Sequence, residues 1–431
     1  MSKLTLIERA EQVFVGGSNG EFRLPPEVNM VVSHGDGCVI YDSAGKAYID
    51  FLLGSGPMIV GHNNPEVVDA VKRQIDKGTS FMAINEPAIQ LAERVVEASP
   101  CGQKVRLVVT GSEAVQFALR AARSFTGRDR ILRFEGGWHG VSDSVLHGSR
   151  SLSLGNYPAT LPDGGGIPLS GSAEVLATPF NDVEQAVNVV KKHHHEIAAI
   201  LIEPLQRCIL PKPGFFEAMR KLANQYGIIL IFDEIVTGFR LAWGGAQERY
   251  GIKSDIAVYG KTISGGYPMA AICGRKDIMD VMNGWRAADD PQRVIASGTF
   301  NGYPVAAVAG LATMDILARP GVYDQLFTMG DYITREIEAM GERLSIPLMV
   351  GGEGPVLQVL FTNEHEIVDY GSMFRADKNK AFIFGIELIK RGVFVSPYEK
   401  IYLSTAHTDG HVDRLLEEIK NVLEQVIAKM D

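Results

Sequence analysis

Short apolar runs alternate along this chain with longer stretches of helical periodicity. The runs near residues 105–110, 130–134, 197–202, 228–233, 254–259 and 269–274 have strand length and little internal alternation. Such runs are typical of strands buried on both faces of a parallel sheet. Between and after them, residues 112–123 and 305–317 have helical patterns. The middle of the chain is therefore predicted to form a layered α/β domain.

The two ends of the chain have a different pattern. Residues 39–50 are predicted to form a β-hairpin with Gly45 near its turn, and residues 355–362 another strand. The last helix carries one apolar stripe, made by Val412, Leu415, Leu416, Ile419, Val422, Leu423 and Val426. At 431 residues the chain exceeds one ordinary core. We expect a large domain at residues 65–320 and a smaller α+β domain built from residues 1–64 and 321–431.

Composition and charge narrow the class of protein. The chain is 46% hydrophobic and 22% charged, as in soluble globular proteins, and its net charge of −9 argues against nucleic acid or anionic membranes as partners. Its four cysteines have neither pairing nor metal-ligand spacing. No signal peptide or membrane span is expected, so we predict a cytoplasmic protein. The run His193–His195 is interpreted as a helix end, and no metal site is expected.

Two of the buried runs end on opposite charges. Asp233 closes the first, and Lys261 follows the second between Gly260 and Gly265. The ends of neighbouring strands are where open α/β sheets bind ligands, although a salt bridge capping the sheet would give the same pattern. Burial would favour the neutral lysine amine, which is the nucleophile that attacks an aldehyde. A buried aspartate needs a cationic partner, and a protonated pyridine nitrogen is one.

The segment Asp233-Glu-Ile-Val-Thr-Gly-Phe-Arg240, followed by Lys261, resembles the core motif of class III pyridoxal-phosphate aminotransferases. The resemblance implies the type I fold, in which a mostly parallel seven-stranded sheet lies between helices, beside the smaller domain from both termini. It also implies that Lys261 carries pyridoxal 5'-phosphate covalently. Asp233 would then pair with the ring nitrogen and let the ring accept electrons.

Other residues fit the same resemblance. A Gly-Ser turn at Gly111 and Ser112 precedes a helix that we expect Ser112 to cap, and such a turn suits a phosphate. The resemblance gives Trp138 the stacking position on the cofactor ring, with His139 beside it. Trp138 as an ordinary core residue and Gly111-Ser112 as an ordinary turn are the alternatives. Further contacts implied by the resemblance come from Glu203, which supports the groups on the ring, and from Thr299, which reaches the phosphate of a partner subunit in a homodimer with shared active sites.

The resemblance covers nearly the whole chain and is closest to the glutamate-1-semialdehyde 2,1-aminomutase branch. The loop that ends in Arg23 is similar to one that binds a substrate carboxylate there, and Ser55 and Glu399 are also implied to contact substrate. A surface arginine is the alternative for Arg23. The Gly-rich residues 148–171 are interpreted as a mobile lid.

Several residues depart from that branch. Ser55 stands where it has tryptophan, Trp138 replaces tyrosine, and Gln206-Arg207 replaces a small residue and an amide. We therefore predict an aminotransferase that moves an amino group from an amino-carboxylic acid to an oxo acid by a ping-pong mechanism. The aminomutase, which forms 5-aminolevulinate, is the alternative. A lyase, racemase or decarboxylase on this fold and a non-catalytic relative are further alternatives.

Overall fold

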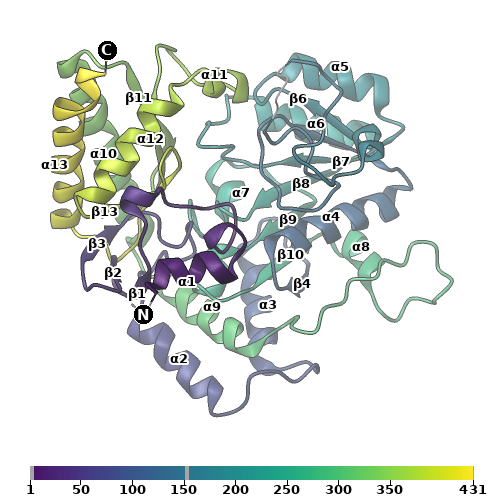
Figure 1. Cartoon of the computed structure of the whole chain (residues 1–431). Helices are drawn as coiled ribbons and strands as arrows, with labels where there is room; N and C mark the ends of the chain where they lie inside the picture. The colour runs from purple at the N-terminus through teal and green to yellow at the C-terminus, as the bar shows by residue number, and fades with distance from the viewer. Residues whose placement is uncertain (1–3, 151–154, 431) are drawn as a thin grey trace.

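The computed structural model describes residues 4–150 and 155–430. A seven-stranded sheet forms its centre, in the order β4-β10-β9-β8-β7-β5-β6 (Figure 1). All neighbours in it are parallel except for β10, which is antiparallel to β4 and β9. The strands are β4 (Lys104–Val108), β5 (Arg130–Phe134), β6 (Val175–Thr178), β7 (Ile197–Ile202), β8 (Ile229–Glu234), β9 (Ile256–Tyr259) and β10 (Ala270–Gly274). The sheet predicted from the apolar runs is confirmed.

Helices cover both faces of this sheet, as the continuous apolar runs predict. Strand β8 shows why, because Ile229 and Ile231 pack into the cluster that includes α4 (Gly111–Thr126). The alternate residues Leu230 and Phe232 pack into the cluster that includes α5 (Val183–His193) and α6 (Phe215–Tyr226). Successive side chains of a strand point to opposite faces, so a strand between two helical layers must be apolar throughout. The short α7 (Gly245–Arg249) and α8 (Lys276–Met279) lie in connections around the sheet.

The ends of the chain meet in a second unit. The predicted hairpin is present as β2 (Val39–Asp42) and β3 (Ala47–Asp50), with β1 (Val32–Asp36) beside β2. The C-terminal strand β13 (Val393–Phe394) adds to β3 in parallel and completes a four-stranded sheet. Figure 1 shows these purple N-terminal strands beside the yellow-green C-terminal helices. A three-stranded sheet completes the unit, made by β11 (Leu348–Glu353), β12 (Val356–Phe361) and β14 (Ile401–Tyr402).

The helices of the C-terminal part are α10 (Val322–Leu344), α11 (Tyr370–Phe374), α12 (Lys378–Lys390) and α13 (Asp409–Gln425). The apolar stripe predicted for the last helix is buried from Val412 to Leu423. Near the N-terminus, α1 (Leu6–Val13) begins with a capping box from Thr5, and Asn64 caps α2 (Pro65–Ile75). Helix α2 contacts α9 (Pro304–Leu317), which also contacts α3 (Glu86–Ala98).

The three-segment division at residues 64/65 and 320/321 stays a prediction. One apolar cluster includes Val67 of α2 and Leu91 of α3 together with Phe394 and Leu415 from the C-terminal part, so the core continues across both proposed boundaries. Within the part of the chain that is described, no single helix has the length and apolar character to cross a membrane. Among residues 4–150 and 155–430, one bent pair, α9 and α10, with 76° between its helices, meets the length and composition test.

Candidate functional site

Asp233 and Lys261 lie at the same edge of the central sheet. Strands β8 and β9 pair in parallel, with Asp233 opposite Val258 in the register. Lys261 follows β9 by two residues and starts a short 3-10 helix, Lys261–Ser264, with a φ of +48°. Asp233 is buried, whereas Lys261 is half-buried and not enclosed as its sequence context predicts. The two residues therefore lie at the ends of adjacent strands, and the lysine is open to a ligand.

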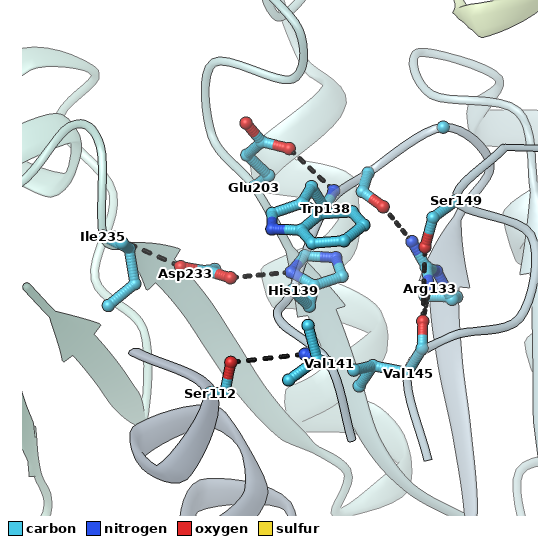
Figure 2. A network of polar contacts seen from close by, with 12 residues as sticks. Ser112, Arg133, Trp138, His139, Val141, Val145, Ser149, Glu203, Asp233 and Ile235 are labelled. Atoms are coloured by element: carbon cyan, nitrogen blue, oxygen red, sulfur yellow. Dashed lines mark hydrogen bonds and ion pairs between the residues drawn. The ribbon is translucent and has the colours of Figure 1, made fainter. Parts of the chain in front are cut away.

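The Asp233 carboxylate is held by two contacts (Figure 2). One oxygen lies 2.8 Å from Nδ1 of His139, and the other accepts the backbone N–H of Ile235 at 3.2 Å. Both Asp233 and His139 are buried. Nε2 of His139 has no hydrogen-bond partner among the described residues. A buried carboxylate held by one ring nitrogen and one backbone N–H is suited to a further cationic partner.

Trp138 presents its ring to the same site. Its backbone N–H donates to Oε2 of Glu203 at 3.0 Å, and its side chain is 37% exposed. The guanidinium carbon of Arg150 lies 5.7 Å from the centre of the Trp138 ring, and that guanidinium is 3.6 Å from the carboxylate of Glu21. A large ring that is held in place yet exposed can take a flat partner. The loop that contains Glu21 also ends in Arg23, so Arg150 connects that loop to Trp138.

Glu203, at the end of β7, is buried and uses both oxygens. Nζ of Lys400 lies 3.4 Å from Oε1. Burial alone would raise the pKa of Glu203, but the charges of Lys400 and Arg207 and the Trp138 N–H hold it below its usual value. Burial alone would lower the pKa of Lys400, yet the Glu203 carboxylate holds it above its usual range. The pair is therefore ionised and fixes the Trp138 backbone. Lys400 was not predicted, because nothing in its local sequence indicates its partner.

The predicted helix cap at Ser112 is wrong. Thr110 caps α4, because its hydroxyl accepts from the Glu113 N–H while the Glu113 side chain accepts from the Thr110 N–H. Ser112 lies inside the first turn, and its Oγ accepts the N–H of Val141 at 3.2 Å. The turn still has the features of an anion site, since the first N–H groups of a helix have no partner within the helix. Gly140 allows the loop to come this close, because a Cβ there would lie 2.5 Å from Ser112 Oγ.

Ile235 is a site residue that the sequence analysis missed. A Cβ at Gly111 or at Gly260 would lie 2.9 Å from its Cδ1, so Ile235 packs closely against both glycines. It is half-buried, apolar and bonded through its N–H to Asp233. The signal in the sequence that could have identified Ile235 is its position two residues after Asp233, near the end of a buried strand. A flat group placed between Ile235 and Trp138 would have an apolar contact on each face, which suits a pyridine ring.

Tyr402 and Arg240 were also missed, and they connect the Ser55 loop to Lys261. Nζ of Lys261 lies 5.9 Å from the Tyr402 ring centre, and the Arg240 guanidinium carbon lies 5.2 Å from it. Arg240 is fully buried and donates to the carbonyl of Gly56 and to Oγ1 of Thr262. Ser55, next to Gly56, is exposed with a φ of +67°. The structure thus brings the Ser55 loop beside the lysine.

Three other predicted residues are not joined to this network by hydrogen bonds. Arg23, Thr299 and Glu399 are all exposed, and in the described part of the chain none of their side chains bonds to Asp233, Lys261 or their partners. The predicted lid at residues 148–171 includes residues 151–154, which lie outside the described residues. At its start, the N–H groups of Ser149 and Arg150 donate to the carboxylate of Asp163. Its mobility stays a prediction.

The cysteines of the chain are buried thiols. All four cysteines, Cys38, Cys101, Cys208 and Cys273, are free and buried. Burial raises the pKa of Cys38 to about 11 and that of Cys208 to about 12, so both are thiols at neutral pH. Across residues 4–150 and 155–430, no three potential ligands of the His, Cys, Asp and Glu types are grouped as a metal site.

Comparisons with known proteins agree with this geometry. Residues 24–423 match the family described as aminotransferase class-III. The chain is 38% identical over 422 residues to a glutamate-1-semialdehyde 2,1-aminomutase of Desulforudis audaxviator, which covers 96% of this chain and 95% of that protein. It is 36% identical over 428 residues to the protein of the same name from Desulfitobacterium hafniense (strain Y51), with 97% of each covered. An omega-transaminase structure from Sphaerobacter thermophilus is similar with a TM-score of 0.92 and 32% identity, covering 98% of this chain and 97% of that one. The predicted fold class is confirmed.

Proposed function

The chain belongs to the aminotransferase class-III family, and from this we propose that it moves an amino group between an amino-carboxylic acid and an oxo acid. Enzymes of this class use pyridoxal 5'-phosphate, and we assign it as the cofactor here. When bound, this group supplies an aldehyde carbon that amines attack and a ring that accepts electrons. The observation that carries the proposal is the placement of buried Asp233 near the end of β8 and of half-buried Lys261 just after the adjacent parallel strand β9.

The residues around this pair fit the cofactor. Lys261 would hold it covalently through Nζ, and the Asp233 carboxylate would hold the ring nitrogen. Trp138 and Ile235 would cover the two ring faces, while Gly111 and Ser112 offer N–H and hydroxyl groups to the phosphate. His139 keeps one Asp233 oxygen in place at 2.8 Å. Glu203 and Lys400 fix the Trp138 backbone.

Lys261 would also move the proton in the reaction. When it is not bonded to the cofactor, the Nζ amine of Lys261 could take a proton from the substrate Cα and donate it again later in the reaction. Its partial exposure suits this, because the side chain can swing without opening the core. Tyr402 limits the swing on one side, since its ring centre lies 5.9 Å from Nζ.

Two forms of amino transfer compete. The curated relatives reported above are named as aminomutases, and these names support the predicted alternative better than the predicted aminotransferase. Features of this chain favour the aminotransferase. Ser55 is small and exposed where that branch has tryptophan, and Arg207 stands where it has an amide. A less enclosed pocket favours release of an oxo product between half-reactions. On this ground we propose the aminotransferase with a ping-pong mechanism, and the aminomutase as second candidate.

Two measurements test the proposal. Borohydride reduction of the yellow protein should fix the cofactor to a peptide that contains Lys261, and a label on another residue would refute the site. Incubation with an amino donor alone should release one equivalent of oxo product. Continuous conversion of glutamate-1-semialdehyde to 5-aminolevulinate without an acceptor would instead establish the second candidate.

We further propose a homodimer with shared active sites, in which Thr299 reaches the partner's phosphate. Exposed apolar side chains support this on two neighbouring segments. Met82 and Ile84 are 78% and 84% exposed, and Ile295 is 74% exposed. Asn85 bonds to the carbonyl of Gly302 at 2.9 Å, so these segments lie together. Free, buried cysteines support the proposed cytoplasmic location.

A further inference from the structure

Arg207 occupies an unusual backbone position at the edge of the site. Arg207 and Cys208 have φ values of +51° and +63°, and the N–H of Ile209 donates to the carbonyl of Gln206 at 2.7 Å. This is a tight turn with both central residues in the left-handed region, where glycine and asparagine are usual. Strained conformations of larger residues concentrate at functional sites. This turn places Arg207 at the edge of the site, four residues after Glu203.

One nitrogen of the Arg207 guanidinium is anchored, and the rest of the group is available. Nε donates to the carbonyl of Gly136 at 2.9 Å, two residues before Trp138. That carbonyl is itself fixed, because a Cβ at Gly136 would overlap the ring of Tyr370. No carboxylate in the described ranges lies within 4.0 Å of the guanidinium, although Arg207 is half-buried. Its two terminal nitrogens therefore remain as a fork that can bind a carboxylate.

The surrounding charges do not neutralise this fork. Glu203 is close enough for the Arg207 charge to lower its pKa, but its two oxygens contact Lys400 and the N–H of Trp138, and it forms no ion pair with Arg207. Glu399 contributes a negative charge to the same neighbourhood, felt at Cys208, but it is exposed and forms no ion pair with Arg207. Lys400 and Arg207 thus place two cations near Glu203, and only Lys400 is within ion-pair distance of that carboxylate. An anionic group of a bound ligand could therefore pair with the Arg207 guanidinium.

We propose that Arg207 is a specificity-determining residue that binds a second carboxylate of the substrate, which makes the substrate class amino dicarboxylic acids and the matching oxo acids. This rests on the proposed function and on the predicted role of Arg23, which we propose binds the first carboxylate. The Arg23 loop is tied to the same face of the site through Glu21, Arg150 and Trp138. A substrate bound at the ring that Trp138 covers would then have one arginine for each of its two carboxylates.

Binding of unreactive acids to the cofactor-loaded protein tests the inference separately from turnover. Isothermal titration with glutarate, a dicarboxylate, and butyrate, a monocarboxylate, gives the two dissociation constants. Arg207→Gln should weaken glutarate at least about tenfold, as expected for a lost charged hydrogen-bonded pair, and butyrate less than about twofold. Arg23→Gln should weaken both acids. The exposed Arg335, which packs on Tyr332 in α10, provides a matched control, and Arg335→Gln should change neither constant.

The Arg207→Gly variant distinguishes a role of Arg207 in ligand binding from a role in the stability of the fold. Glycine adopts a φ of +51° without strain, which offsets the lost hydrogen bond from Nε to Gly136, so this variant should keep nearly the wild-type Tm while losing the same affinity for glutarate. Equal weakening of glutarate and butyrate by Arg207→Gln, or unchanged glutarate binding, would overturn the proposal. A lowered Tm in Arg207→Gly with glutarate affinity intact would assign Arg207 a structural role instead. Because none of these readouts needs turnover, a failure of the proposed transamination would leave the Arg207 result interpretable.

Discussion

Lys400 and Glu203 form an ion pair in the site, with 3.4 Å between Nζ and Oε1, although they lie 197 positions apart in the chain. Lys400 comes from the segment just before β14, and Glu203 from the end of β7. Their contact joins the C-terminal part of the chain to the central sheet, at the residue that fixes the Trp138 backbone.

Lys400→Met should lower the free energy of unfolding by about 3 kcal/mol, because it leaves a buried carboxylate without its cation. Adding Glu203→Gln should recover part of this loss. The matched control is Lys276→Met, which breaks a shorter, 2.8 Å pair with Asp280 on the surface and should cost less than about 1 kcal/mol. Urea denaturation measures all of them. Equal losses for Lys400→Met and Lys276→Met would contradict the buried pair.

Substitutions of Thr110 and of Ser112 should affect different properties, the first the stability of the protein and the second its affinity for the cofactor. Thr110→Ala should cost about 1 kcal/mol of stability through the lost cap, and Thr110→Ser should restore it. Ser112→Ala should keep stability but weaken pyridoxal phosphate binding about tenfold, because one charge-assisted hydrogen bond is lost. Denaturation of the cofactor-free protein and fluorescence titration with the cofactor distinguish the two effects. A stability loss in Ser112→Ala as large as that of Thr110→Ala would restore Ser112 as the cap.

Shared active sites predict complementation between inactive chains. A hybrid of a Lys261→Ala chain and a Thr299→Ala chain has one site with both lesions and one intact site. Random reassembly makes half of the dimers hybrid, so mixing should restore about a quarter of wild-type activity. Mixing Lys261→Ala with a chain that carries both substitutions leaves no intact site and serves as the control. If chains exchange but activity stays at the Thr299→Ala level, Thr299 does not serve the partner.

His407 should make stability depend on pH. Burial, with a smaller effect from His411, lowers the pKa of His407 to about 4. Between about 4 and its ordinary value of 6.5 the unfolded chain binds a proton that the folded protein does not, so stability falls as the pH is lowered through this window, by up to about 3 kcal/mol. His407→Asn keeps an acceptor for the Ser404 N–H and should remove this dependence.

The effect of His407 is measured as the difference between His407→Asn and wild type at each pH, because protonation of Glu234 changes the free energy of unfolding in the opposite direction. Burial raises the pKa of Glu234 to about 7, so the folded protein holds an extra proton there as the pH falls. Free energies of unfolding between pH 4 and pH 7 give the slope for each protein. Identical slopes would show that His407 is already protonated in the folded state.

Local signals predicted much of the fold. The apolar runs predicted six of the seven strands of the central sheet, and the hairpin predicted at residues 39–50 is present as β2 and β3. The error at Ser112 has a simple cause, since Thr110 and Ser112 are both good caps and only the distant Val141 N–H decides between them. The contacts of Lys400, Arg240 and Arg207 arise from pairs far apart in sequence, which one sequence does not reveal. The roles of Lys261 and Asp233 stay predictions, although the structure brings their strands together.

The parallel pairing of β3 with β13, in which Ile49 lies opposite Val393, has a consequence for how the chain is made. During synthesis the hairpin β2–β3 leaves the ribosome early and keeps one edge unpaired until more than three hundred further residues have followed. Contacts of such long sequence separation form slowly because the loop must close first. The last stretch of translation therefore completes the first sheet, and a nascent chain truncated before Val393 would expose an edge strand open to aggregation.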